Sequence, residues 1–145
     1  QGGKKAMAAG FQVSEYWMPG LGGKEMTRAH AENTARVLTA VNPHYIRSRP
    51  FRAVPGTPLH AQIQTGEVHT LSPKEQLIEL KQMITALEVT SKVCFDHAGN
   101  NWRDSQGRVL FTHDYEGYQF PEQKAKVLDL IEEGLESALL PSPFI

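Results

Sequence analysis

This chain of 145 residues contains a single cysteine, Cys94. One cysteine excludes an internal disulfide and any metal cage built from several thiolates of this chain. Basic and acidic residues nearly balance, at 15 and 16, so the chain lacks the positive excess typical of nucleic-acid-binding domains. We find no apolar run long enough to span a bilayer and no secretory signal in the first residues. We therefore expect a cytoplasmic protein that binds neither nucleic acid nor a membrane.

The stretch that organises the chain is a predicted strand followed by a glycine-rich loop. Residues 11–18 are rich in aromatic and β-branched types, which favour a strand, and Pro19 ends it. Gly20 and two further glycines precede a predicted helix over residues 27–41. The loop matches neither GxGxxG nor a Walker A motif. It is either a ligand-contacting loop at the carboxyl end of its strand or a plain tight connection.

The remaining elements continue this alternation of strands and helices. Residues 44–51 and 91–96 read as two further strands. A helix is predicted to start at residues 72–75, whose sequence Ser-Pro-Lys-Glu fits a capping box. Pro121 is predicted to open the last helix, and Lys4–Gly10 reads as the end of a helix. Nothing before Lys4 starts that helix, so we expect that the sequence begins partway through an element.

Strands that alternate with helices predict an α/β fold with about three parallel strands and flanking helices. A loop or short hairpin near residues 104–111 precedes the C-terminal helix. Three parallel strands make a small sheet, and such sheets require cover on both faces. We therefore interpret the chain as a partial (β/α) TIM-type barrel. Its βα units occupy residues 1–90, and residues 91–145 form the last strand and a C-terminal extension.

Three motifs along the chain occur in the order found in a known enzyme family. Tyr16-Trp-Met-Pro-Gly-Leu-Gly-Gly23 is followed by Pro43-His-Tyr-Ile-Arg-Ser-Arg49 and then by Val54-Pro-Gly-Thr-Pro-Leu59. This order resembles radical S-adenosylmethionine (SAM) enzymes of the elongator/oxygen-independent coproporphyrinogen oxidase type. Asp96-His97 with Asn100 also resembles the tail of uncharacterised iron–sulfur oxidoreductases in that superfamily. The resemblance extends over residues 4–137.

The resemblance implies which residues face the cofactor. The strands would be the fifth and sixth of a TIM-type barrel, whose ends help to bind SAM. Met18, Pro19 and Gly20 match the fifth-strand position that contacts the adenine. Arg47 and Arg49 match the sixth strand, whose end borders the cofactor and the substrate.

The iron–sulfur cluster of the family is where this sequence departs from the pattern. The family holds a [4Fe–4S] cluster through three cysteines of a CxxxCxxC loop, and one cysteine cannot replace them. The resemblance therefore implies the C-terminal half of such an enzyme, with SAM and the cluster bound by the full-length parent and not by this chain alone. The expected partner is the missing N-terminal half of the barrel, or a second copy that associates through the open sheet edges.

The charged and polar residues singled out above can also be explained by purely structural roles. On an alternating strand, Arg47 and Arg49 share one face, and they either contact an anionic ligand or form a structural ion pair. Asp96, His97 and Asn100 form either a polar cluster that relays a proton or a braced loop. His97 could also join His113 and Asp114 in a metal site, but no close ligand spacing supports one, so we expect no metal.

Two alternative hypotheses therefore propose a function of a different class from a radical SAM enzyme. One is a non-catalytic α/β module for binding or assembly. The other is a metal-dependent hydrolase that uses His97, His113 and Asp114.

Overall fold

The computed structural model describes residues 1–104 and 106–137, which form a mixed α/β fold around an open sheet. Within these residues the sheet has four strands in the order β1 (Ser14–Trp17), β2 (Tyr45–Ser48), β3 (Lys92–Cys94) and β4 (Tyr118–Gln119). The pairs β1–β2 and β2–β3 are parallel, as the sequence predicts, and β4 runs antiparallel to β3.

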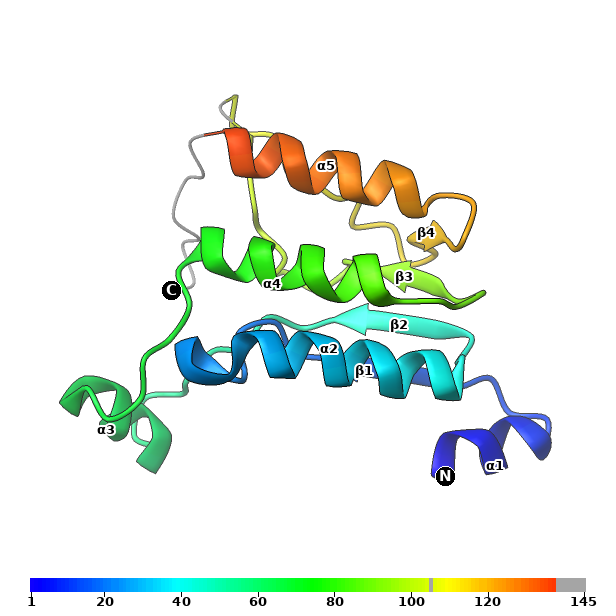
Figure 1. Ribbon diagram of the computed structural model, residues 1–145, viewed down its shortest axis with the longest axis horizontal. Helices are drawn as coiled ribbons and strands as arrows, with labels where there is room; N and C mark the ends of the chain where they lie inside the picture. The colour runs from blue at the N-terminus through cyan, green and yellow to red at the C-terminus, as the bar shows by residue number, and fades with distance from the viewer. Residues whose placement is uncertain (105, 138–145) are drawn as a thin grey trace.

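Five helices accompany the sheet within the described ranges: α1 (Gly2–Ala8), α2 (Gly23–Val41), α3 (Pro58–Thr65), α4 (Pro73–Ala86) and α5 (Lys124–Glu136). Helix α4 packs between α2 and α5, and the three lie side by side over one face of the sheet (Figure 1). Helix α3 stands apart from that layer (Figure 1). None of the described helices has the length and apolar character needed to cross a bilayer.

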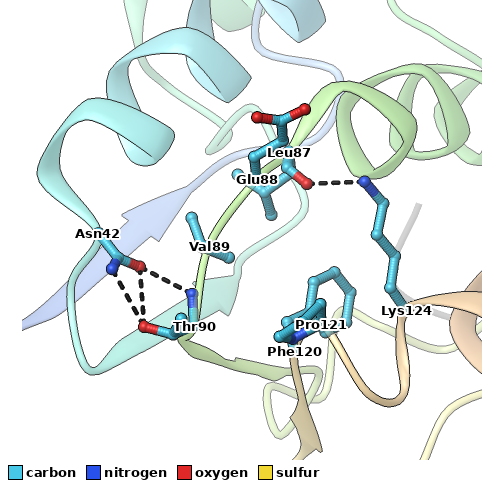
Figure 2. Close-up of a pocket in the computed structure, with 8 residues that line it drawn as sticks. All are labelled: Asn42, Leu87, Glu88, Val89, Thr90, Phe120, Pro121 and Lys124. Carbon is cyan, nitrogen blue, oxygen red and sulfur yellow. Dashed lines mark hydrogen bonds between the residues drawn. The ribbon is translucent and has the colours of Figure 1, made fainter.

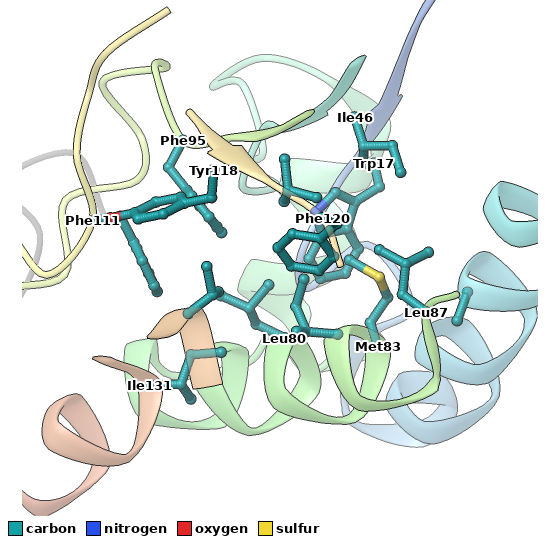
Figure 3. Close-up of a cluster of buried hydrophobic side chains, with 14 of the residues drawn as sticks. Trp17, Ile46, Leu80, Met83, Leu87, Phe95, Phe111, Tyr118, Phe120 and Ile131 are labelled. Carbon is teal, nitrogen blue, oxygen red and sulfur yellow. The ribbon is translucent and has the colours of Figure 1, made fainter. Parts of the chain in front are cut away.

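The core lies between this helix layer and the sheet (Figure 3). Ile46 comes from β2 and Phe95 directly follows β3, while Leu80 and Met83 come from α4, and all four are fully buried. The ring of Phe95 stacks on Phe111 with centroids 4.0 Å apart. Burial of such apolar surface is the main force that holds the helices on this face.

The predicted capping box is confirmed at the start of α4. The Ser72 hydroxyl accepts from the Glu75 N–H at 3.3 Å, and the Glu75 carboxylate accepts from the Ser72 N–H at 2.7 Å. The N-terminal helix end is also found as predicted, because Gly10 follows α1 with a φ of +88°.

Several element boundaries and the strand number differ from the sequence prediction. The sheet has four strands instead of about three, because Tyr118–Gln119 pairs with β3 over two residues, too short a run for any sequence period to reveal. Helix α5 starts at Lys124 and not at Pro121, and α2 starts at Gly23 and not near Thr27. The predicted hairpin is a single antiparallel bridge between Arg103 and Val109.

The described strands form an open sheet and not a closed barrel. The end of the predicted C-terminal extension, residues 138–145, lies outside the described residues.

Candidate functional site

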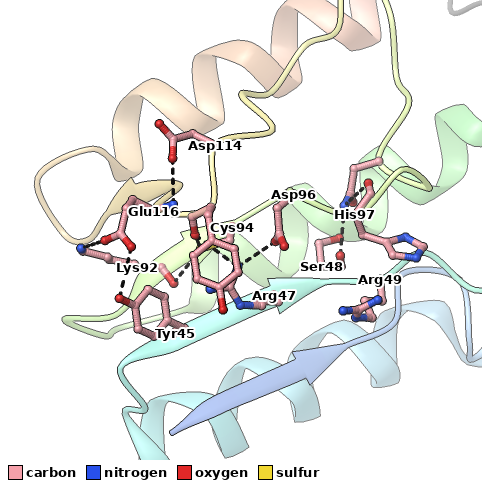
Figure 4. A network of polar contacts seen from close by, with 12 residues as sticks. Tyr45, Arg47, Ser48, Arg49, Lys92, Cys94, Asp96, His97, Asp114 and Glu116 are labelled. Carbon is pink, nitrogen blue, oxygen red and sulfur yellow. Dashed lines mark hydrogen bonds and ion pairs between the residues drawn. The ribbon is translucent and has the colours of Figure 1, made fainter. Parts of the chain in front are cut away.

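The face of the sheet opposite the helices carries polar and aromatic side chains (Figure 4). Ile46 points into the core, so its neighbours Tyr45 and Arg47 point to the other face. Tyr16 of β1 and Cys94 of β3 lie opposite Arg47 in the strand register and share that face. The described helices α2, α4 and α5 cover the apolar face of the sheet and leave this opposite face without a helix (Figure 1).

Arg47 is held in a structural ion pair. Its side chain is 4% exposed, and Nη1 lies 2.9 Å from Oδ1 of Asp96. Nη1 also donates to the Tyr115 carbonyl at 3.2 Å, and the guanidinium lies 3.8 Å from the centre of the Tyr115 ring. Burial is the largest influence and acts to lower the pKa of Arg47, but the contact with Asp96 and the nearby Cys94 and Tyr115 groups together outweigh it, so the pKa is raised. The charge of Arg47 is therefore already balanced within the protein.

Arg49, two residues further along, is in a different situation. Its guanidinium lies 4.5 Å from the centre of the Tyr16 ring, and Nη2 donates to the Tyr16 hydroxyl at 3.4 Å. None of the ion pairs found among the described residues includes Arg49. A partly exposed guanidinium stacked on an aromatic ring remains able to bind an anion.

The predicted ligand loop follows β1 at the carboxyl end of the sheet. Pro19 and Gly20 are buried, while Met18 is exposed. The Pro19 carbonyl accepts from Phe51 N–H at 2.8 Å, and the Gly20 carbonyl accepts from Gly23 N–H at 3.1 Å. Because these backbone groups already have partners, the loop offers a ligand its side chains and not its carbonyls.

Two glycines of this loop face other groups of the protein at close range and not open space that a ligand could fill. Gly20 has a φ of +85°, and a Cβ there would lie 3.0 Å from Nε2 of Gln76 on α4. Gly23 has a φ of +60°, and a Cβ there would lie 2.9 Å from the His69 carbonyl oxygen. Both positions favour glycine for conformation and for space. This agrees with the tight-connection reading of the loop.

Glu79 on α4 ties this loop to the helix layer, and sequence reasoning missed it. Its fully buried carboxylate accepts from Gly20 N–H at 2.8 Å and from the Thr27 hydroxyl at 2.6 Å, and it lies 3.1 Å from Nδ1 of His30. Burial raises the pKa of Glu79, but these three hydrogen bonds together lower it below its usual range. The available signal was a carboxylate in the apolar stripe of a helix, one residue before Leu80.

The loop after β3 is braced by Asn100. Its amide donates to the Ser48 carbonyl at 3.0 Å and to the His97 carbonyl at 3.1 Å. His97 Nδ1 in turn accepts from the Gly99 N–H at 3.1 Å. Oδ1 of Asn100 and Oγ of Ser48 are buried and lack a hydrogen-bond partner among the described residues. Buried polar atoms of this kind call for a partner such as an ordered water.

The metal and cluster hypotheses depend on whether their candidate ligands lie close together. Among the described residues, no group of three or more His, Cys, Asp or Glu residues lies close enough to hold a metal ion. His113, a ligand of the hydrolase hypothesis, instead places Nε2 3.1 Å from the Asn100 carbonyl oxygen. Burial raises the pKa of the Cys94 thiol to about 11, which disfavours the thiolate that a cluster needs. The residues present do not fit a [4Fe–4S] cluster.

A hollow of about 310 Å³ lies at the amino end of the sheet, away from the residues described above (Figure 2). The polar groups that line it already form hydrogen bonds within the protein. Lys124 Nζ donates to the Leu87 carbonyl at 2.7 Å beyond the end of α4, and Asn42 Oδ1 accepts from Thr90 N–H at 2.9 Å. Parallel α/β sheets bind ligands at the carboxyl ends of their strands, so this hollow is the weaker candidate.

No family model matches this chain. Searches of curated proteins and of solved structures also gave no match. The candidate site is therefore defined by its own geometry: Arg49 on Tyr16, the side chain of Met18, and the Asn100-braced loop.

Proposed function

We propose that this chain forms part of the wall of a radical SAM-type (β/α) barrel and contributes to its SAM site. The observation that carries the proposal is the sequential order β1-β2-β3 of parallel strands with α2 and α4 on a single face. Consecutive βα units with all helices on one side are how a barrel wall is built, whereas doubly wound sheets carry helices on both faces. The helix-free face then corresponds to the barrel interior.

Three side chains at the carboxyl end of this face suit SAM. Tyr16 is 53% exposed and Met18 is 38% exposed, so both offer aromatic or apolar surface to an adenine ring. Arg49 is the cation next to them and can pair with a carboxylate. When bound beside its cluster, SAM supplies the radical chemistry; this chain binds and orients it. The cluster is held by another part of the parent protein.

The free edge of β1 is where that other part would join. Val13 and Trp17 direct their carbonyls to β2, so the peptide groups of Ser14 and Tyr16 point to the open edge. A hollow of about 490 Å³ lies beside this edge, lined in part by Val37 of α2. A strand edge that is unpaired among the described residues and has apolar surface next to it favours pairing with another strand. We propose the remaining half of the barrel as that partner, with pairing to a second copy as the alternative.

The test is made on the natural gene product that contains this sequence. We expect it to be about twice this length, to contain iron and sulfide for one cluster, and to bind SAM in isothermal titration calorimetry. Arg49→Ala should weaken SAM binding by about tenfold, the value of one charge-assisted hydrogen bond. Arg36→Ala, an exposed arginine on α2, is the matched control and should leave binding unchanged.

A second function is favoured by one observation. The close approaches to Gly20 and Gly23 are made by the protein's own Gln76 and His69, as expected of a non-catalytic α/β binding or assembly module. The same measurements separate the two. A natural product of 145 residues without iron would contradict the radical SAM proposal and support the module.

A further inference from the structure

Glu79 is a charged side chain in the apolar layer between α2 and α4. It is completely buried, yet it lies between hydrophobic positions of α4 that pack in the core. Taking a carboxylate out of water is costly unless donors satisfy it. Its three donors come from the loop after β1, through Gly20, and from α2, through Thr27 and His30. One side chain of α4 thus connects to the loop after β1 and to the start of α2, which lie 49 to 59 residues earlier in the sequence.

The contact with Gly20 fixes the path of the loop. The Gly20 N–H points at Oε1 of Glu79 at 2.8 Å, and Gly20 holds a φ of +85°. Met18 precedes it by two residues, so the direction of the Met18 side chain depends on how this turn is held. The His30 ring, which also contacts Glu79, stacks on Trp17 with centroids 6.1 Å apart. The Glu79 carboxylate therefore holds both ends of the turn: Gly20 directly, and Trp17 through the His30 ring.

We propose that Glu79 is a positioning residue for the SAM contact of the Met18–Gly20 turn. It holds this turn in the form in which Met18 and Tyr16 face the ligand. The inference rests on the proposed function for the identity of the ligand, but not for the control of the turn. A ligand then meets a surface that is already ordered, which spares it the cost of ordering the turn.

The amide variant Glu79→Gln is the conservative replacement. Its Oε1 can still accept from Gly20 and His30, and its Nε2 can donate to Thr27, whose hydroxyl can reverse its role. Glu79→Leu fills similar space but accepts no hydrogen bond. A residue with a purely structural role would change stability without changing affinity in this pattern.

The experiment measures two quantities in the natural gene product and its variants: SAM affinity by calorimetry and exchange of the Gly20 amide proton by NMR. Glu79→Leu should raise Gly20 exchange and weaken SAM binding, each by about tenfold, while Glu79→Gln should stay within about threefold of the wild type for both. Val127→Ala, a core truncation on α5 far along the chain from the turn, controls for general destabilisation and should leave affinity unchanged.

The outcomes separate the two proposals. Unchanged Gly20 exchange in Glu79→Leu overturns the positioning role, whatever SAM does. Equal loss of affinity in Glu79→Leu and Val127→Ala overturns it as well, because general destabilisation then explains the effect. Absence of SAM binding to the wild type, with Gly20 exchange still raised in Glu79→Leu, contradicts the proposed function and leaves the control of the turn by Glu79 intact.

Discussion

The two faces of the sheet are built by different physical means. On the helix-covered face, Ile46, Val93 and Phe95 are buried against the helix layer (Figure 3). On the opposite face, Arg47 is also buried, beside Asp96 (Figure 4). Its guanidinium also lies against the Tyr115 ring. The first face is stabilised by the removal of apolar surface from water, whereas on the second the pairing of Arg47 with Asp96 offsets the cost of burying the charge.

The difference shows where a ligand has room to act. Most side chains of the covered face are apolar and offer a ligand no hydrogen bond, although Trp17 Nε1 is buried there without a described partner. On the other face, a paired charge such as Arg47 is already balanced. Unused capacity is found at the carboxyl edge, where Arg49 is not part of an ion pair with any described residue. Ser48 and Asn100 keep buried oxygens without described partners at the same edge. Substitutions on the two faces should therefore differ in size and in kind.

The largest effect is expected on the covered face, from Phe95→Ala. Phe95 is fully buried and stacks on Phe111 at 4.0 Å. Its truncation should cost about 4 kcal/mol of unfolding free energy in urea titrations, since it removes apolar burial and leaves a cavity. Phe11→Ala removes a ring that is 67% exposed and should change little. Similar losses for both variants would contradict the assignment of this face as the core.

A smaller but substantial effect is expected from Arg47→Met on the opposite face. The substitution removes the partner of Asp96 and should cost about 3 kcal/mol, because a charge is left uncompensated in a partly buried place. Adding Asp96→Asn to Arg47→Met should recover part of that loss, since the remaining partner is then neutral. A double variant less stable than Arg47→Met alone would show that the pair is not the source of the effect.

A smaller loss of unfolding free energy is expected when the N-cap of α4 in the helix layer is removed. Ser72→Ala removes the hydroxyl that accepts from Glu75 N–H at the start of α4. It should lower the unfolding free energy by about 1 kcal/mol, a typical value for an N-cap. Ser14→Ala, at an exposed position of β1, is the control. No difference between the two would mean that α4 is held by its packing alone.

These elements differ in how far the sequence predicts them. The three parallel strands and the start of α4 were predictable because their signals are local, a strand of aromatic residues or a cap followed by Pro73. The fourth strand was not, because Tyr118–Gln119 is defined only by its pairing with β3. Strand number therefore depends on contacts that no short window of sequence contains.

The candidate site divides in the same way. Sequence reasoning singled out Arg47, Arg49 and Asn100 as candidates, because unusual residue types at strand ends are visible along the chain. It left open whether Arg47 binds a ligand or a carboxylate of the protein. The structure pairs Arg47 with Asp96, which is 49 residues later in the sequence but adjacent in space. Glu79 was missed, since its three donors lie about 50 to 60 residues before it. Partners at such separations are set by the tertiary fold.

The smallest effect on stability is expected from Arg49→Met, the same substitution as at Arg47 but two residues further along. Arg49 makes a cation–π contact with the partly exposed Tyr16 ring and no described ion pair, so the unfolding free energy should change by only about 0.5 kcal/mol. Urea titrations of Arg47→Met and Arg49→Met under identical conditions measure the contrast directly. If Arg49→Met were as destabilising as Arg47→Met, Arg49 would be a structural residue, and the carboxyl edge would lose the cation that the proposed SAM site requires. A small change in stability combined with weaker SAM binding is the pattern expected of a residue that faces a ligand instead of supporting the fold.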